Sequence, residues 1–299
     1  MADDDRQRGS IAIFALWGVA LIFMLIAPVA FATRGELQIA RNALAETRAR
    51  LAAEAGTQLG LLRLLRRHDS SGAAFDGTPQ AWQQGSTRVT IAIADEAGKI
   101  DLNVAPLELL AGLFEAVGAN HQAAGLIACN ILDWRGDSGA DCSEPGGAHA
   151  GRRFVAPEQL AELPGVDEPL YDRVADDVTV ATGASAIDPR VAPRTVLLAI
   201  PGATPSLVDS FLESRAMWRD LGADDSSLVP SAAAPYVMAS PGRDYTITAL
   251  AVTADGARYR ADLQVRLTGR DTQPYQVLAW RTPPATRGAA PAATARRVP

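Results

Sequence analysis

The side chains best suited to chemistry are four carboxylates in one glycine-rich stretch. Residues 131–151 read ILDWRGDSGADCSEPGGAHAG, in which Asp133, Asp137, Asp141 and Glu144 alternate with small residues. Hard cations prefer several oxygen ligands, and a flexible acidic loop of this kind can wrap around calcium. The order of residues is not that of an EF-hand, which requires D-x-[DN]-x-[DN]-G. A solvated acidic loop is the alternative, and the residues leave both open.

The two cysteines of the chain belong to the same region: Cys129 precedes the acidic stretch and Cys142 lies within it. In an oxidising compartment they could form a disulfide, and closing so short a loop stabilises a fold by roughly 3 kcal/mol in the chain-entropy model. The alternative is two unpaired thiols, with Cys129 buried in a helix. The choice depends on whether this part of the chain is exported.

No other constellation of side chains indicates catalysis. His68, His121 and His149 are scattered and share no metal-ligand spacing with the cysteines, which argues against zinc. Neither a G-x-S-x-G nucleophile elbow nor a Walker loop occurs in the sequence. We therefore expect a protein that is not an enzyme.

Charge is unevenly distributed along the 299 residues. The chain carries a net charge of −6, but residues 101–234 contain 20 Asp and Glu against 8 Arg, a balance of −12, so the remainder carries +6. A middle region this acidic repels phosphate backbones. The composition, 48% hydrophobic, suits one large domain or two smaller ones.

An uncharged apolar block near the N-terminus predicts a membrane span. Residues 11–32 would form roughly 33 Å of helix at 1.5 Å per residue, enough to cross the hydrocarbon core. Arg6 and Arg8 precede the block, so we expect the leader to stay cytoplasmic and everything after residue 33 to be exported. Beyond the block, apolar and small residues recur at helical spacing and extend the helix. They are Leu37, Ala40, Leu44, Thr47, Leu51, Ala55 and Leu59.

One phrase occurs three times in the middle of the chain. It reads IDLNVAPLELL at residues 100–110, AIDPRVAPRTVLL at 186–198 and, in shorter form, VAPEQL at 155–160. Asp101 and Asp188 precede the proline of the two full copies and are good turn and capping residues.

Each copy predicts the same unit, a helix that begins at a proline, a glycine turn and a second helix. The prolines are Pro106, Pro157 and Pro193, and the glycines are Gly118, Gly165 and Gly202. A single helical hairpin cannot bury its apolar face alone, so the three copies should pack as one helical domain.

Leu-Pro-Gly turns between helices also occur in helix-hairpin-helix motifs, which bind the phosphates of DNA through backbone amides and nearby basic residues. In this sequence the turn LPGVDEP places Asp167 and Glu168 where basic residues would be needed. The acidic turn favours a scaffold and argues against nucleic-acid binding.

Strand patterns stand on both sides of the helical part. Alternating Val89, Ile91 and Ile93, followed by Ile100, predict a strand or a hairpin turning at residues 96–98, after a loop over 70–85. The C-terminal segments YTITALAV, ARYRADLQVRL and PYQVLAWR, with the turn dipeptide Asp255-Gly256, predict three antiparallel strands. We expect the first strand to join this sheet and the sheet to pack on the long helix, an α+β fold.

The N-terminal residues resemble those of a type IV prepilin: a charged leader ends in Arg8-Gly9 and is followed by Ser10 and an apolar helix. In that family a membrane peptidase cuts after the glycine and methylates the new N-terminus. The resemblance implies cleavage between Gly9 and Ser10 and N-methylation of Ser10. The fifth mature position, a glutamate in major pilins, is Phe14 here.

The missing glutamate, the helical insertion and the phrase D-[IL]-N-x-A-P together resemble the K-type minor pseudopilin of the type II secretion system. The resemblance implies a transmembrane pilin helix packed on a small antiparallel sheet, with an inserted all-α domain of SAM-like or helix-hairpin-helix-like hairpins. It also implies calcium at Asp133, Asp137, Asp141 and Glu144, although this chain lacks the tyrosine-bearing segment of the family's calcium loop.

The implied organisation has six parts. They are a prepilin leader (1–9), a transmembrane segment (10–32), the pilin helix and first strands (33–100), the inserted helical domain (101–234), the C-terminal strands (235–281) and a disordered tail (282–299).

The implied role is that of a tip subunit of the pseudopilus, which nucleates assembly with I- and J-type minor pseudopilins and supports export of folded proteins across the outer membrane. Further implied partners are the prepilin peptidase, the inner-membrane secretion platform, and the secretin or cargo. The chain would cross the bacterial inner membrane once, with its bulk in the periplasm. The alternatives are a membrane-anchored DNA receptor of the competence type and a plain anchored periplasmic scaffold.

Overall fold

A computed structural model describes residues 4–66, 75–137, 142, 151–221, 231–240 and 242–283. Within the first helix the side chains of residues 15–24 and 36–66 are described. His68, His149, Asp141, Glu144 and most of the predicted tail lie outside the described residues. The same holds for the side chains of Gly9, Ser10 and Phe14.

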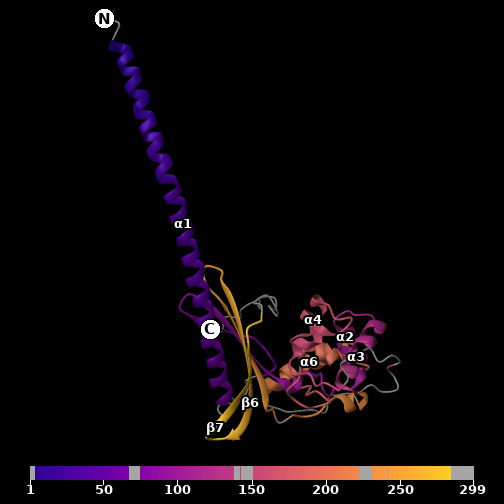
Figure 1. The fold of residues 1–299 in the computed structure, drawn as a ribbon. Coiled ribbons are helices and arrows are strands. Elements are labelled where there is room, and N and C mark those ends of the chain that lie inside the picture. Colours follow the sequence, from indigo (N-terminus) through magenta and orange to yellow (C-terminus); the bar gives the residue numbers. More distant parts are fainter. Residues whose placement is uncertain are drawn as a thin grey trace.

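One helix, α1 (Asp4–Leu65), forms the N-terminal part of the molecule and continues through Pro28. Its C-terminal part lies against the sheet, while its N-terminal part extends far beyond the other elements (Figure 1). Over the residues described, a search for a helix both long and apolar enough to cross a membrane finds none.

The sheet has five antiparallel strands in the order β1-β2-β5-β6-β7. The strands are β1 (Gln80–Gln84), β2 (Thr87–Asp95), β5 (Asp244–Val252), β6 (Arg258–Arg270) and β7 (Gln273–Arg281). Strand β2 pairs with β5, with Ile91 opposite Ala249, so the predicted strand around residues 89–93 joins the three C-terminal strands as expected. The predicted α+β class with an antiparallel sheet is confirmed.

Two local predictions are wrong. Residues 80–84, expected in a loop, form edge strand β1, because their mostly polar side chains suit a solvent-exposed edge. No hairpin turns at residues 96–98. A short 3₁₀ helix, η2 (Glu96–Gly98), begins there because the Asp95 carboxylate accepts a hydrogen bond from the Ala97 amide. The chain then leaves the sheet, and β3 (Ile100–Asp101) pairs in parallel with β4 (Val178–Thr179).

Small residues of α1 form the contact with the sheet. Ala49, Ala52 and Ala53 are buried there. A Cβ added at Gly60 would lie 2.5 Å from Ile247 Cγ2, so the helix approaches the sheet as closely as it does only because glycine stands at this position. The larger apolar residues of the periodic stripe lie on the other side of the helix: Leu37, Leu44 and Leu51 are about half exposed.

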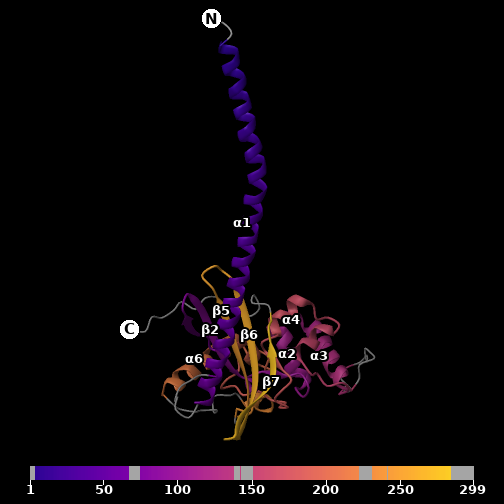
Figure 2. The same cartoon turned by 60° about the vertical axis from the view of Figure 1, so that its left-hand side comes forward.

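The helical region, residues 96–243, connects the neighbouring strands β2 and β5. It lies across the sheet from α1 (Figures 1 and 2). Its helices are α2 (Leu107–Ala116), α3 (His121–Arg135), η3 (Pro157–Glu162), α4 (Glu168–Val174), α5 (Arg194–Leu198), α6 (Pro205–Leu221) and η5 (Ser231–Tyr236).

The three predicted hairpins are present, and their turn glycines Gly118, Gly165 and Gly202 all have positive φ, at 98°, 87° and 81°. Two details differ from the prediction. The first helix of the second hairpin is the 3₁₀ helix η3. Pro106 and Pro193 stand one residue before their helices, as caps, whereas Pro157 is the first residue of its own.

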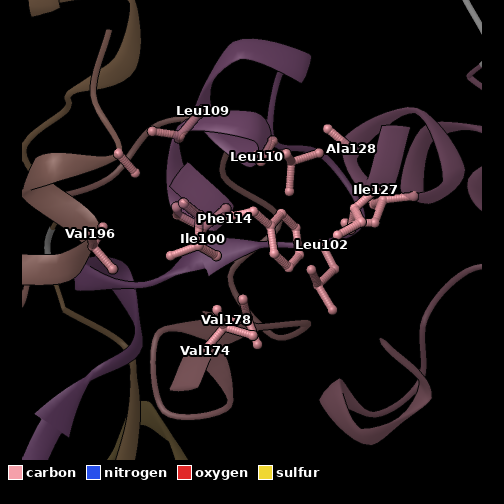
Figure 3. Close-up of a cluster of buried hydrophobic side chains, with 14 of the residues drawn as sticks. Ile100, Leu102, Leu109, Leu110, Phe114, Ile127, Ala128, Val174, Val178 and Val196 are labelled. Atoms are coloured by element: carbon pink, nitrogen blue, oxygen red, sulfur yellow. The ribbon is translucent and has the colours of Figure 1, made fainter. Parts of the chain in front are cut away.

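All three hairpins contribute to one apolar core. Figure 3 shows Phe114 of α2 among side chains from β3, α3, α4, β4 and α5. A separate apolar core lies between α1 and the sheet, built around Tyr245, Ile247 and Leu263. Among the described residues no buried side chain belongs to both cores.

Two glycine substitutions test the close contact of α1 with the sheet. Gly60→Ala should lower the free energy of unfolding by about 1–3 kcal/mol, because the added methyl group meets Ile247 despite alanine's better helix propensity. Gly125→Ala in α3, where nothing lies within 4 Å of the added Cβ, should instead raise it by about 1 kcal/mol. Urea unfolding measures both. A stabilised Gly60→Ala variant would contradict the packing described.

Candidate functional site

The two full copies of the repeated phrase fold into the same turn. Asp101 Oδ1 accepts a hydrogen bond from the Asn103 amide at 2.9 Å, and Asp188 Oδ1 accepts one from the Arg190 amide at 3.0 Å. In each copy the aspartate carbonyl also accepts the amides three and four residues later. The aspartates are turn residues, as predicted, and both are buried.

In the first and third hairpins, an arginine from the second helix donates hydrogen bonds to the carbonyl oxygens of this turn. Arg135 of α3 donates to the carbonyl oxygens of Leu102 at 3.1 Å and Ala105 at 2.8 Å. Arg215 of α6 donates to the carbonyl oxygens of the equivalent residues, Pro189 at 2.9 Å and Ala192 at 2.6 Å.

The sequence analysis missed these arginines, although a signal for them exists. Residues 132–135 read LDWR and residues 212–215 read LESR, each within the second helix of its hairpin. The first and third hairpins are therefore two copies of a longer unit than the phrase itself. The middle hairpin begins at Val155-Ala156 and lacks the aspartate, although its second helix also carries an arginine, Arg173, in the sequence LYDR.

Arg135, the last residue of α3, lies within the predicted calcium-binding stretch. Arg135 Nε lies 2.9 Å from Asp137 Oδ2, so the Asp137 carboxylate already has a cationic partner. Asp133 occupies the position of Glu213 in the duplicated unit, in the last turn of α3. Within the described ranges no group of three His, Cys, Asp or Glu side chains could hold a metal ion. Because Asp141 and Glu144 lie outside those ranges, calcium stays a prediction.

Cys129 and Cys142 form a disulfide, with their Cα atoms 5.5 Å apart. The bond attaches the acidic loop to the middle of α3. Together with the pair between Arg135 and Asp137, it gives the loop two attachments to the helix that precedes it.

At two of the hairpin turns a side chain already accepts a hydrogen bond from an N-terminal amide of the following helix. At the second turn Asp167 Oδ1 accepts a hydrogen bond from the Leu170 amide at 2.8 Å, and at the first turn Asn120 Oδ1 accepts one from the Ala123 amide. Helices α3 and α4 are thus capped by the side chain of the residue that precedes them, and the cap of α4 is a carboxylate. These contacts favour the scaffold interpretation over the DNA-binding one.

A group of buried polar and charged side chains lies between the sheet and the helical region. Glu96 is 1% exposed; its carboxylate binds Lys99 Nζ at 2.6 Å, accepts a hydrogen bond from the Thr179 hydroxyl, and accepts one from Gln264 Nε2 of β6 at 3.2 Å. Burial would raise the pKa of Glu96, but Lys99 and the hydroxyls of Thr179 and Thr246 outweigh it, so the pKa lies below its ordinary value.

The alternation predicted for β6 is present, but the polar face is buried as well as the apolar one. Ala261, Leu263 and Val265 face the core under α1, as the period of two predicts. The opposite, polar residues Arg260, Asp262 and Gln264 are buried as well, because the helical region covers them. Sequence patterning alone does not distinguish a polar face in water from one that meets polar groups of another part of the chain.

A scan of family models and a search of curated proteins return no match. Among solved structures, the chain is similar to a chain of the crystal structure of the GspK-GspI-GspJ complex from the enterotoxigenic Escherichia coli type 2 secretion system. The two share 12% sequence identity with a TM-score of 0.51, and the match covers 84% of this chain and 99% of the other. The likeness is one of fold.

Replacing the two turn-closing arginines tests the duplicated unit. Arg135→Met and Arg215→Met should each lower the free energy of unfolding by about 2–4 kcal/mol, because carbonyls of buried residues lose a charged donor. The control Arg194→Met removes an exposed pair with Asp209 and should lower the free energy of unfolding far less. Equal losses in all three variants, measured in urea, would show that the turns do not need these arginines.

The raised pKa of the Asp177 carboxyl predicts that the stability of the fold depends on pH. Burial, and then the neighbouring Asp176, raise the pKa of this carboxyl from 3.8 to about 7. The folded chain therefore holds a proton that the unfolded chain has lost, so stability falls as pH rises from about 4 to about 7 and is flat above. In Asp177→Asn this slope in melting temperature should be reduced, whereas Glu162→Gln, at an exposed carboxyl, should keep it. An unchanged slope in Asp177→Asn would contradict the assignment.

Proposed function

We propose that this chain is a K-type minor pseudopilin of a type II secretion system. The observation that carries the proposal is the fold likeness, which extends over 99% of a chain from the GspK-GspI-GspJ complex. It agrees with the prepilin-like leader and with the phrase that introduces the helical insertion, two features read from the sequence independently.

Protein assembly suits the shape of the molecule better than catalysis. The exposed face of α1 carries Leu37, Leu44 and Leu51 seven residues apart, a spacing that lies along one side of a helix and suits packing against helices of other subunits. Partners of this kind would be the I- and J-type minor pseudopilins.

The helical region supports a position at the tip of the filament. It projects from the sheet on the side away from α1 (Figures 1 and 2), so a subunit stacked in the middle of a filament would have to accommodate it. Phe14, in place of a glutamate, fits the same position, since a tip subunit has no neighbour above it to pair with. In this role the chain nucleates the pseudopilus and supports export across the outer membrane.

The proposal also includes the location and the processing of the chain. Residues 11–32 cross the inner membrane, the rest of the chain stands in the periplasm, and a prepilin peptidase removes residues 1–9. The inner-membrane platform, and the secretin or cargo, are then the further partners. The proposed role also includes a calcium ion bound by the acidic loop.

Mass spectrometry of the mature N-terminus tests it. Co-expressed with a prepilin peptidase, the chain should begin at N-methylated Ser10, and a Gly9→Val variant should keep its leader. An intact Met1 in the unchanged chain, or a cut at another position, would exclude a pseudopilin and leave a plain anchored scaffold.

A further inference from the structure

The contact between the sheet and the helical region differs from every other contact between elements in this fold. Each half has its own apolar core, one under α1 and one among the hairpins. What lies between them is polar, and we call it the polar interface. It consists of Glu96, Glu158, Asp176, Arg215 and the Ala181 carbonyl from the helical region, and Asp76, Thr246, Arg260, Gln264, Arg266 and Arg281 from the sheet and the segment before it.

The charges across the polar interface are complementary. Two acidic groups of the helical region meet arginines of the sheet: Asp176 with Arg260 at 3.0 Å and Glu158 with Arg281 at 3.2 Å. One further pair has the opposite polarity, because Arg215 of α6 lies 3.9 Å from Asp76, which is bridged to β2. Arg266 donates to the Ala181 carbonyl at 2.8 Å. The uneven charge of the sequence, −12 over residues 101–234 and +6 over the rest, therefore has a structural role.

The arginines on the sheet also have partners within the sheet. Arg260 binds both oxygens of Asp262 at 3.0 Å, and Arg266 binds both oxygens of Asp244 at 2.6 and 3.1 Å. Loss of the helical-region partners would therefore not leave these guanidinium groups without a counter-ion. Such contacts exchange for water at little net cost, whereas the apolar cores do not.

The chain passes between the sheet and the helical region in two short segments, and hydrogen bonds attach both segments to the helical region. The Ala97 carbonyl accepts a hydrogen bond from the Asp188 amide at 2.7 Å, on the way out of the sheet. On the way back, Asp188 Oδ2 accepts one from the Ser240 amide at 2.9 Å. The backbone could therefore pivot on the sheet side of these bonds, near Asp95 and Gly242-Arg243, without disturbing either core.

From this geometry we infer that the helical region is a separable head, held on the sheet by complementary charge, which can release and re-dock with both apolar cores intact. The trigger is competition for the outer pairs, by salt or by a charged partner surface, because Asp176 and Glu158 have side chains about half exposed. The inference does not depend on the secretion role.

Distances between spin labels in the full chain, purified in mild detergent, test this head movement. The labels go on Gln84→Cys of β1 and His121→Cys of α3, both exposed, with the native disulfide left oxidised. The unchanged background should give one narrow distribution at low salt. The double substitution Asp176→Asn with Glu158→Gln should raise the ratio of open to closed molecules about fivefold, as two partly exposed pairs are lost. One molar sodium chloride should act in the same direction.

The matched control is Asp209→Asn, which removes an equally exposed aspartate from a pair inside the helical region. It should leave the distribution narrow. A second variant, Arg281→Gln, removes one pair from the sheet side and should broaden the distribution as Glu158→Gln alone does. Circular dichroism confirms that each variant is folded. A distribution that stays narrow in the double variant and in high salt, or that broadens equally in Asp209→Asn, would overturn the inference.

Discussion

The side chain of Glu96 is almost completely buried, yet it lies between two apolar cores rather than inside either of them. Its carboxylate connects Lys99 and Thr179 of the helical region with Gln264 of the sheet. A buried carboxylate is tolerated only where cations and hydrogen-bond donors replace its water. The chain must therefore bring these groups together at the point where it leaves β2. This requirement determines how the helical region stands on the sheet and why the polar face of β6 is covered.

The sheet with α1 and the helical region are packed in different ways. Under α1, alanine and glycine let the helix approach the sheet closely, and Leu61 and Leu64 are buried in the same core. Leu37, Leu44 and Leu51 are exposed and available to other helices. In the helical region the hairpins are too short to be stable alone, and they share one core. Arg135 and Arg215 then supply donors for turn carbonyls of the first and third hairpins.

Much of the fold could be predicted from local patterns. Period-two alternation located the strands β2, β5, β6 and β7, and the repeated phrase with its glycines located the hairpins. Strand β1 was missed because QAWQQ carries little apolar periodicity. Of the two alternatives for residues 89–100, the strand is present and the hairpin turning at residues 96–98 is not, because β2 pairs with β1 and with the distant β5. Of the candidate site residues, Asp101 and Asp188 are turn residues as expected, while Asp137 pairs with Arg135, a contact that no spacing rule suggests.

The sequence by itself determined the α+β class, the succession of long helix, three hairpins and C-terminal strands, the three glycine turns and the segregation of charge, because each depends on residues close together in the chain. Only the tertiary structure decided which face of α1 is buried, which arginines close the turns, and that the acidic helical region meets the arginines of β6 and β7. These outcomes depend on contacts between residues far apart in sequence, such as Glu96 with Gln264 and Glu158 with Arg281. The pattern of a polar face is the same whether it meets water or an oppositely charged surface, so the partner is known only once the chain has folded.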